Sequence, residues 1–220
     1  MFKKIFYKII GVYRVLEDSP SYNSFSNYSD YILNIQKTMV LNGSSDTVSL
    51  DLGCGSEIKN PFSAKSLWGV DISHSVTNEN VKLANLSIEP IPFSSQYFDF
   101  VTAHDFLEHV PRYLLVPHLI CKSNLPPELD LHGRFPFVEL MNEVYRVLKP
   151  GGYFLSVTPA FPFSIAFTDP THINYINEHT FENYFSTRTI GKIYGFNGKF
   201  ELIRQGWRGR YLISLMRRPL

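Results

Sequence analysis

Residues 48–73 read VSLDLGCGSEIKNPFSAKSLWGVDIS and decide the fold. Two short apolar runs, 48–52 and 67–71, have the composition of strands that are buried on both faces of a parallel sheet. Between them, Gly53 and Gly55 allow a sharp turn in which the backbone approaches a ligand with no Cβ in the way. The stretch therefore predicts a ligand site at the carboxyl edge of a parallel sheet.

The acids of this stretch indicate which ligand the turn holds. Asp71 ends the second apolar run, where a carboxylate can accept hydrogen bonds from both hydroxyls of a ribose. A dinucleotide site requires a small third residue in the glycine motif, but Ile58 stands there. Pro61 argues against a long helix whose N-terminus would hold a pyrophosphate. Asp51 suits a cationic ligand with an ammonium group, so the residues favour S-adenosylmethionine over NAD.

Further motifs follow in order: ANL at 84–86, PIPF at 90–93, FDFV at 98–101, HDFLEHV at 104–110 and EVYRVLKPGG at 143–152. With DLGCG at 51–55, they resemble the class I S-adenosylmethionine-dependent methyltransferases along nearly the whole chain. The resemblance implies a single α/β domain over residues 1–220. Its Rossmann-like seven-stranded sheet would be parallel with an antiparallel C-terminal hairpin and helices on both faces. The segment between Asp51 and Asp71 is short for the family, which predicts an irregular first crossover.

The resemblance also implies a set of cofactor-binding residues. These are Asp51, Gly53, Cys54, Gly55, Asp71, Ile72, Asn85, Leu86, His104 and Asp105. Asn85 is a mild departure, because the family often has Asp-Leu at this pair. Cys54 is interpreted as a small residue of the cofactor loop, because nothing nearby would activate its thiol.

The apolar periodicity predicts the remaining elements. Helices are expected over 28–41 and 137–148, the second ending before Pro150. Parallel strands are expected at 48–52, 67–71, 98–104 and 152–157, with a weaker strand at 81–86. Residues 199–205 and 210–217 are expected to form an antiparallel pair.

Two inserted segments are expected to lie as loops over the active edge. Residues 111–136 contain five prolines and are interpreted as a lid or a subunit contact. Residues 159–181 follow the fifth strand, whose carboxyl end adjoins the methyl donor in the fold that the resemblance implies, and a helix is expected to begin around Phe181. The segment 167–185 resembles a subset of bacterial methyltransferases that are often found with surface-polysaccharide biosynthesis genes.

These segments supply the candidate catalytic residues. A hydroxyl acceptor must lose its proton as the oxygen attacks, and histidine is the usual base. The Pro-Thr turn between Asp169 and His172 is expected to bring both side chains together, with the acid orienting the imidazole. His109 is a second candidate, although its position is often structural in the family.

A metal site is the alternative use of the same residues. The acids and histidines that would have to converge are Asp105, Glu108, His109, Asp169 and His172. No single segment has the dense ligand spacing that identifies a zinc site, so no metal is predicted.

Composition limits the class of protein and its partners. A chain of 220 residues that is 44% hydrophobic is long and apolar enough for one globular domain. A formal charge of +1 gives no basic surface for nucleic acid. Two cysteines give no disulfide framework, which favours the cytoplasm.

The N-terminal residues 1–25 are interpreted as a basic amphipathic helix and its lead-in. Within residues 1–16, apolar side chains share one helical face and basic side chains lie opposite. Such a helix either packs on the protein or a neighbouring subunit of a homo-oligomer, or lies peripherally at the inner face of a membrane.

The sequence thus predicts an enzyme that transfers the methyl group of S-adenosylmethionine to an oxygen acceptor. A hydroxyl of a bacterial surface glycan or its precursor is the favoured acceptor. The alternatives are a small-molecule or quinone-type acceptor and a catalytically inactive cofactor-binding accessory module. An NAD-type oxidoreductase is disfavoured by Ile58 and Pro61.

Overall fold

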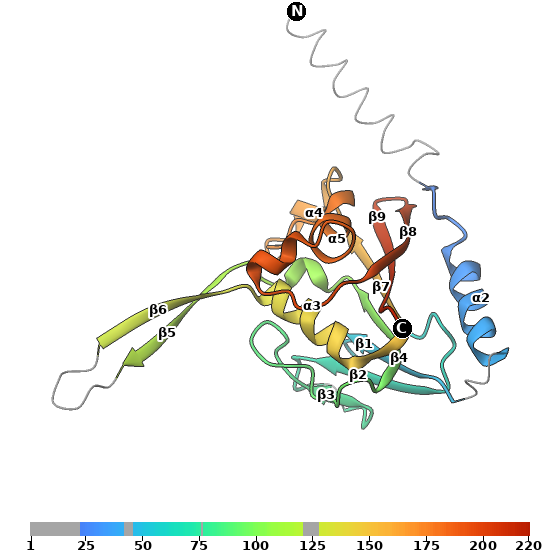
Figure 1. Cartoon of the computed structure of the whole chain (residues 1–220), viewed down its shortest axis with the longest axis horizontal. Coiled ribbons are helices and arrows are strands. Elements are labelled where there is room, and N and C mark those ends of the chain that lie inside the picture. Colours follow the sequence, from blue (N-terminus) through green and yellow to red (C-terminus); the bar gives the residue numbers. More distant parts are fainter. Residues whose placement is uncertain (1–22, 42–45, 76, 121–127) are drawn as a thin grey trace, which may run out of the picture.

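The computed structural model describes residues 23–41, 46–75, 77–120 and 128–220, which form a seven-stranded sheet in the order β3-β2-β1-β4-β7-β9-β8 (Figure 1). The strands are β1 Val48–Leu52, β2 Ser66–Asp71, β3 Val81–Leu83, β4 Phe98–His104, β7 Leu148–Pro159, β8 Glu201–Arg208 and β9 Tyr211–Arg217. The first five of these pair in parallel, and β9 runs antiparallel to both β7 and β8. The predicted mixed sheet with its C-terminal hairpin is confirmed.

The order of the strands places the functional edge. The chain leaves β1 toward β2 and β3 on one side, and returns to β4 and β7 on the other. Ligands of open parallel sheets bind outside the carboxyl ends of the strands at such a reversal. Asp51 lies in register with Gly69 of β2 and Thr102 of β4, so the ends of all three strands meet at this edge.

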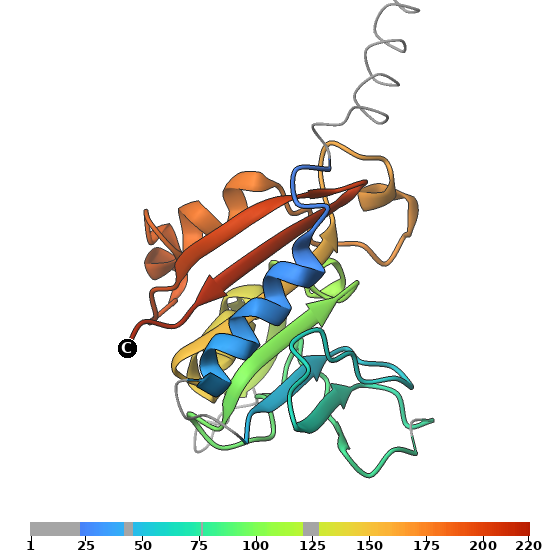
Figure 2. The same cartoon turned by 90° about the vertical axis from the view of Figure 1, so that its right-hand side faces the viewer.

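Helices cover both faces of the sheet, as predicted. On one face lies α2 (Tyr28–Leu41), which crosses the strands in Figure 2 and buries Ile32 in a cluster with Phe100 and Leu155. On the other face lie α3 (Pro136–Val147) and α5 (Glu178–Phe185), which contribute Val144 and Phe181 to the larger core cluster. The sheet is therefore buried on both faces.

The first crossover contains no helix in its described residues 53–65, which agrees with the prediction of an irregular link. Asn60 and Ala64 close this segment into a turn, because each donates a hydrogen bond to the other. Phe62 anchors the turn by stacking on Phe100 of β4, with ring centroids 4.2 Å apart. Aromatic packing thus replaces the usual helix over this part of the sheet.

The inserted segment 111–136 differs from its prediction. Instead of a loop over the active edge, β5 (Leu114–Ile120) and β6 (Glu128–Arg134) form an antiparallel pair that extends away from the sheet as an arm (Figure 1). Pro117 is tolerated in β5 because a two-stranded ribbon consists of edge strands only. The prediction of a loop is therefore wrong for these strands.

The second inserted segment, 159–181, holds the short helix α4 (Ile165–Thr168), and the turn η2 (Leu107–His109) lies opposite it after β4. The last turn, η3 (Ile190–Tyr194), follows α5. The expected helix start near Phe181 is wrong by almost one turn, because Asn177 caps α5. Its Oδ1 accepts a hydrogen bond from the N–H of His179, and its own backbone N–H donates to the Thr180 hydroxyl.

The predicted amphipathic helix at residues 1–16 lies outside the described residues and stays a prediction. Among the helices that the structure describes, none is long and apolar enough to cross a membrane.

Candidate active site

The glycine turn follows β1 as predicted. Gly53 and Gly55 have φ angles of +65° and +57°, which glycine adopts without steric cost. The backbone N–H groups of Gly53 and Cys54 donate to the carbonyl of Val70, which fixes the turn to β2. A Cβ on Gly53 would lie 2.4 Å from the ring of Phe106, so both the backbone angle and this ring demand glycine.

Asp71 stands beside the turn at the end of β2. Its Oδ2 accepts a hydrogen bond from the N–H of Gly55 at 2.8 Å, and its Oδ1 accepts one from the N–H of Ser73 at 2.8 Å. A carboxylate has about four acceptor positions, so each oxygen retains capacity for a ligand hydroxyl. The next side chain, Ile72, is 60% exposed and offers an apolar surface. The arrangement can receive a ribose and the ring attached to it.

Asp51 organises the turn from inside. It is 1% exposed, and its oxygens accept hydrogen bonds from the N–H of Lys59 and the hydroxyl of Thr102. His104 ends β4 as predicted and brings its Nδ1 to 3.7 Å from Asp51 Oδ1. Because Asp51 is covered, direct contact with a ligand's ammonium group would require the Lys59 segment to move.

The predicted cofactor-binding residues Asn85 and Leu86 differ in their exposure. The side chain of Leu86 is buried in the large core cluster, so it is not open to a ligand. Asn85 uses its Oδ1 to accept a hydrogen bond from the N–H of Ser87 at 3.1 Å, which stabilises a turn. The cofactor-binding role of Asn85 and Leu86 stays a prediction, in which Leu86 would act through its backbone.

Cys54 has the environment of a packing residue. Its side chain is buried, and its Sγ would lie 2.5 Å from a Cβ placed on Gly69 of β2. Burial, followed by the charges of Asp51 and Asp71, raises the pKa of the Cys54 thiol to about 11. Such a thiol is protonated at neutral pH and is a poor nucleophile.

A Cys121→Ser variant, which leaves Cys54 as the single cysteine, should therefore react slowly with Ellman's reagent. At pH 8 we expect a rate at least about 100-fold below that of a free thiol, because the thiolate fraction falls tenfold per pKa unit. The same protein in denaturant should react at the rate of a free thiol. Equally fast labelling of the folded protein would show that Cys54 is accessible and activated.

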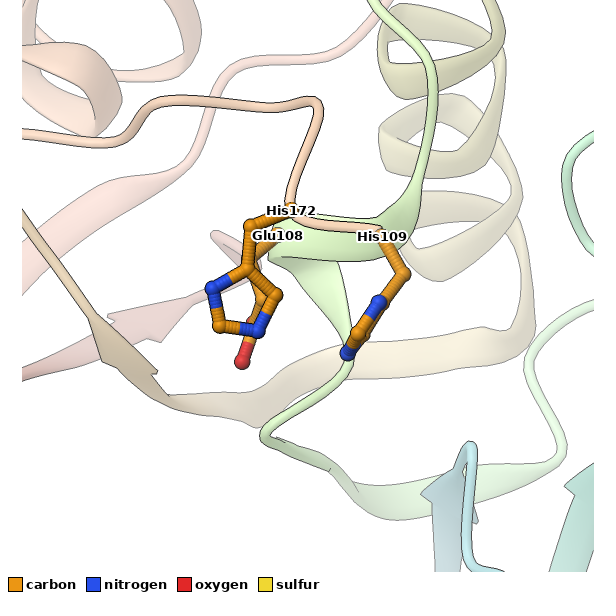
Figure 3. Close-up of side chains that lie close together, drawn as sticks. All are labelled: Glu108, His109 and His172. Carbon is orange, nitrogen blue, oxygen red and sulfur yellow. The ribbon is translucent and has the colours of Figure 1, made fainter. Parts of the chain in front are cut away.

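The carboxyl ends of β4 and β7 lead to a second group of side chains. Glu108 and His109 belong to η2, and His172 lies in the loop after α4. The N–H groups of Ile173 and Asn174 both donate to the Glu108 carbonyl at 2.9 Å, which fixes this loop against η2. One ligand atom from each of Glu108, His109 and His172 consequently lies within 4.8 Å of the other two (Figure 3). We call these three residues the Glu-His-His cluster.

Glu108 is the buried member of the cluster. It is 1% exposed, and its Oε2 accepts a hydrogen bond from the Thr158 hydroxyl of β7 at 2.8 Å. Its Oε1 is buried and has no hydrogen-bond partner among the described residues. Burial raises the pKa of Glu108 to about 7. A buried acid with a free oxygen therefore stands next to two imidazoles.

His109 is oriented by a chain of hydrogen bonds. Thr171 donates its hydroxyl proton to Asp169 Oδ1 at 2.7 Å, and the same hydroxyl oxygen lies 3.0 Å from His109 Nδ1. Because a hydroxyl has one proton, Nδ1 must be the donor in the second contact. In the neutral imidazole, the remaining ring nitrogen of His109, Nε2, therefore carries the lone pair and can accept a proton or bind a cation.

The Asp169 carboxylate forms its hydrogen bonds with Thr171 and not with His172, the predicted partner. Asp169 Oδ1 accepts hydrogen bonds from both the N–H and the hydroxyl of Thr171, which lower the pKa of the carboxyl. His172 Nδ1 is buried without a hydrogen-bond partner among the described residues. The expectation that Asp169 orients the His172 imidazole is therefore wrong, because the Asp169 carboxylate accepts its hydrogen bonds from Thr171.

Asp105, expected at the cofactor, is exposed at the end of β4 with a φ of +50°. Its charge and a hydrogen bond add to burial in raising the pKa of Tyr211. Of the five acids and histidines considered for a metal, the structure brings Glu108, His109 and His172 together and leaves Asp105 and Asp169 outside the cluster.

The loop that carries His172 continues to Tyr175, which lines a pocket of about 820 Å³. The pocket is lined by Arg112, Tyr113, Phe135, Phe137, Val138, Phe161, Phe167, Tyr175, Asn177, His179, Thr180, Asn183, Tyr184, Phe185 and Tyr194. Most of these side chains are aromatic, and they come from the two inserted segments, α3, α5 and η3. Sequence reasoning missed them as a group, and the 15% aromatic content was the one available signal.

The mixed sheet, its terminal hairpin and the glycine turn beside Asp71 define the Rossmann-like fold of the class I methyltransferases. A family model described as a methyltransferase domain matches residues 27–194. The chain therefore belongs to this methyltransferase family, and it is an S-adenosylmethionine-dependent methyltransferase.

The fold is shared with a solved structure at low sequence identity. A protein of Bacillus halodurans C-125 assigned as a methyltransferase has 15% sequence identity and a TM-score of 0.52, covering 84% of this chain and 98% of that chain. A SAM-dependent methyltransferase from Archaeoglobus fulgidus has 15% identity and a TM-score of 0.49, covering 86% of this chain and 94% of that chain. The comparison with curated proteins gave no match.

Proposed function

We propose that the enzyme methylates a hydroxyl oxygen, and that the acceptor is a bacterial surface glycan or its precursor. The observation that supports methylation of an oxygen atom is the Glu-His-His cluster at the carboxyl ends of β4 and β7. An attacking hydroxyl must lose its proton, whereas the sulfonium already activates the methyl group. Two imidazoles beside a buried carboxylate supply groups that promote this loss.

The aromatic pocket supports a ring-shaped acceptor. Phe167 and Tyr175 lie with their ring centroids 5.0 Å apart and are about half exposed in the pocket. The electron-rich faces of such rings attract the polarised C–H groups of a sugar. His172 and Tyr175 lie on one loop. The proposal requires that an acceptor bound against Tyr175 extends one of its hydroxyls to the cluster.

A flat small molecule, including a quinone-type ring, is the second candidate. One observation favours it: several polar groups of the pocket wall are already engaged. Arg112 donates to Asn174 Oδ1 and to the Tyr175 carbonyl, and Asn177 and Thr180 are used in the cap of α5. A phenolic acceptor needs fewer polar contacts than a glycan and would use the same apolar walls.

The acceptor class can be tested with methyl-labelled S-adenosylmethionine and two acceptor panels. One panel contains nucleotide-linked sugars and short oligosaccharides, and the other contains phenols, catechols and hydroquinones. We expect label on a sugar hydroxyl, identified by mass spectrometry and NMR of the product, and no label without enzyme. Label on phenolic oxygen alone would replace the glycan by the second candidate. Label on nitrogen or carbon would overturn the oxygen acceptor itself.

The proposed acceptor is consistent with the expected cytoplasmic location. Residues 1–16 are expected either to pack on the protein or a neighbouring subunit or to lie at the inner face of the membrane. In the second case a glycan precursor on a lipid carrier would be within reach.

A further inference from the structure

We propose that the Glu-His-His cluster binds a divalent transition-metal cation. One ligand atom from each of its three side chains lies within 4.8 Å of the others. Zinc–nitrogen and zinc–oxygen bonds are about 2.1 Å long, so two ligand atoms of one tetrahedral ion lie about 3.4 Å apart. A pair of ligand atoms at the 4.8 Å limit would therefore have to close by about 1.4 Å, which requires rotation of the side chains when the ion binds.

An unsatisfied buried oxygen points independently to a bound ligand. Glu108 Oε1 is buried and has no hydrogen-bond partner among the described residues. Buried polar atoms are nearly always paired, so an unpaired carboxylate oxygen in this cluster requires an explanation. Figure 3 shows the Nε2 side of the His172 ring facing Glu108 and His109. A cation held between the three side chains would pair the Glu108 carboxylate.

The surroundings of His109 also fit a metal ligand. Metal-binding histidines usually donate their second ring N–H to another group, which fixes the tautomer and the ring orientation. Here Nδ1 donates to Thr171, and Thr171 donates to Asp169. The negative charge at the end of this chain strengthens Nε2 as an electron-pair donor. Thr171 and Asp169 are therefore positioning residues for the ligand His109.

The ligand types select the class of cation. Mg²⁺ and Ca²⁺ are bound mainly by oxygen atoms, whereas imidazole ligands favour zinc and its first-row neighbours. Two imidazoles and one carboxylate thus point to an ion such as Zn²⁺. Three protein ligands leave at least one coordination position open. On the proposed function, the acceptor hydroxyl would take this position, and the ion would lower the pKa of that hydroxyl.

The experiment is calorimetric titration of the tag-free full-length protein, cleared of metal with a chelator, with ZnCl₂ and separately with MgCl₂. We expect one Zn²⁺ per chain with micromolar or tighter affinity, and much weaker Mg²⁺ binding. Glu108→Gln and His172→Asn should each weaken Zn²⁺ binding by at least about tenfold, and Thr171→Val should weaken it by about tenfold through loss of ligand orientation. Titration with Co²⁺, followed by its visible absorption, reports the ligand environment directly.

The matched control is His132→Asn, which replaces a histidine on the β5–β6 arm and should leave the affinity unchanged. Binding of S-adenosylhomocysteine and circular dichroism establish that each variant is folded. If Glu108→Gln does not fold, His172→Asn carries the test. The absence of Zn²⁺ binding by the folded wild-type chain, or equal binding by all variants, would overturn the proposal. Zn²⁺ binding without methylation of any hydroxyl acceptor would keep the cation site and overturn the proposed function instead.

Discussion

Replacing His109 with asparagine is expected to lower the turnover number by about 10²–10⁴-fold, the range typical of losing a group that assists proton transfer. The asparagine amide can still donate to the Thr171 hydroxyl in place of Nδ1, so the local hydrogen-bond chain is conserved. What the variant lacks is the nitrogen that carries the lone pair. Affinity for S-adenosylhomocysteine should stay within about twofold, because the glycine turn and Asp71 are untouched.

The measurement is the turnover number at saturating acceptor, beside the dissociation constant of S-adenosylhomocysteine. His132→Asn again serves as the matched control, since it makes the same substitution on the β5–β6 arm. Thr171→Val tests the orientation of the ring and should cost less than His109→Asn, because the lone pair is still present. Normal turnover in His109→Asn would return His109 to a structural role and leave the reaction without its proposed proton acceptor or metal ligand.

The parts of the fold that local sequence determines were predictable. Position 53 has a positive φ and lies against the Phe106 ring, and both features require glycine. A glycine directly after an apolar run therefore predicts the turn from the sequence. The helix 28–41 and the strands at 48–52 and 98–104 have the bounds that periodicity predicts. The β5–β6 pair was missed because prolines usually indicate loops, and the rule weakens in a ribbon whose strands have free edges.

The sequence drew attention to His109 and His172 but did not predict the contacts that these residues make. Asp169 was expected to reach His172 across a turn, but a short side chain bonds its own backbone two residues ahead more readily than a distant ring. The approach of His172 to Glu108 depends on hydrogen bonds between residues far apart in the chain, such as Asn174 Nδ2 to the Leu107 carbonyl. No local pattern contains this information, so the convergence of the cluster required the structure.

Replacing Asp71 with alanine is expected to weaken the binding of S-adenosylhomocysteine by about 10²–10⁴-fold. Two hydrogen bonds from ribose hydroxyls to a carboxylate are each worth about 1.5–3 kcal/mol, and tenfold in affinity corresponds to about 1.4 kcal/mol. The variant also releases the N–H groups of Gly55 and Ser73, which the carboxylate holds at 2.8 Å. Calorimetric titration of wild type and variant measures the loss directly.

Two further variants separate the causes of this loss. Asp46→Asn removes a charge from an exposed ion pair with Lys65 and should leave the affinity unchanged, which excludes a general effect of charge. Asp71→Asn keeps one acceptor oxygen and should lower the affinity for S-adenosylhomocysteine by about tenfold. One ribose hydrogen bond loses its charge assistance, and in the other the amide NH₂ would donate to the hydroxyl. If Asp71→Ala binds as tightly as wild type, the ribose does not lie at the end of β2. The glycine turn would then have to hold the cofactor without Asp71. Because the N–H of Gly55 donates to the Asp71 carboxylate, the turn would also have to keep its geometry without this hydrogen bond.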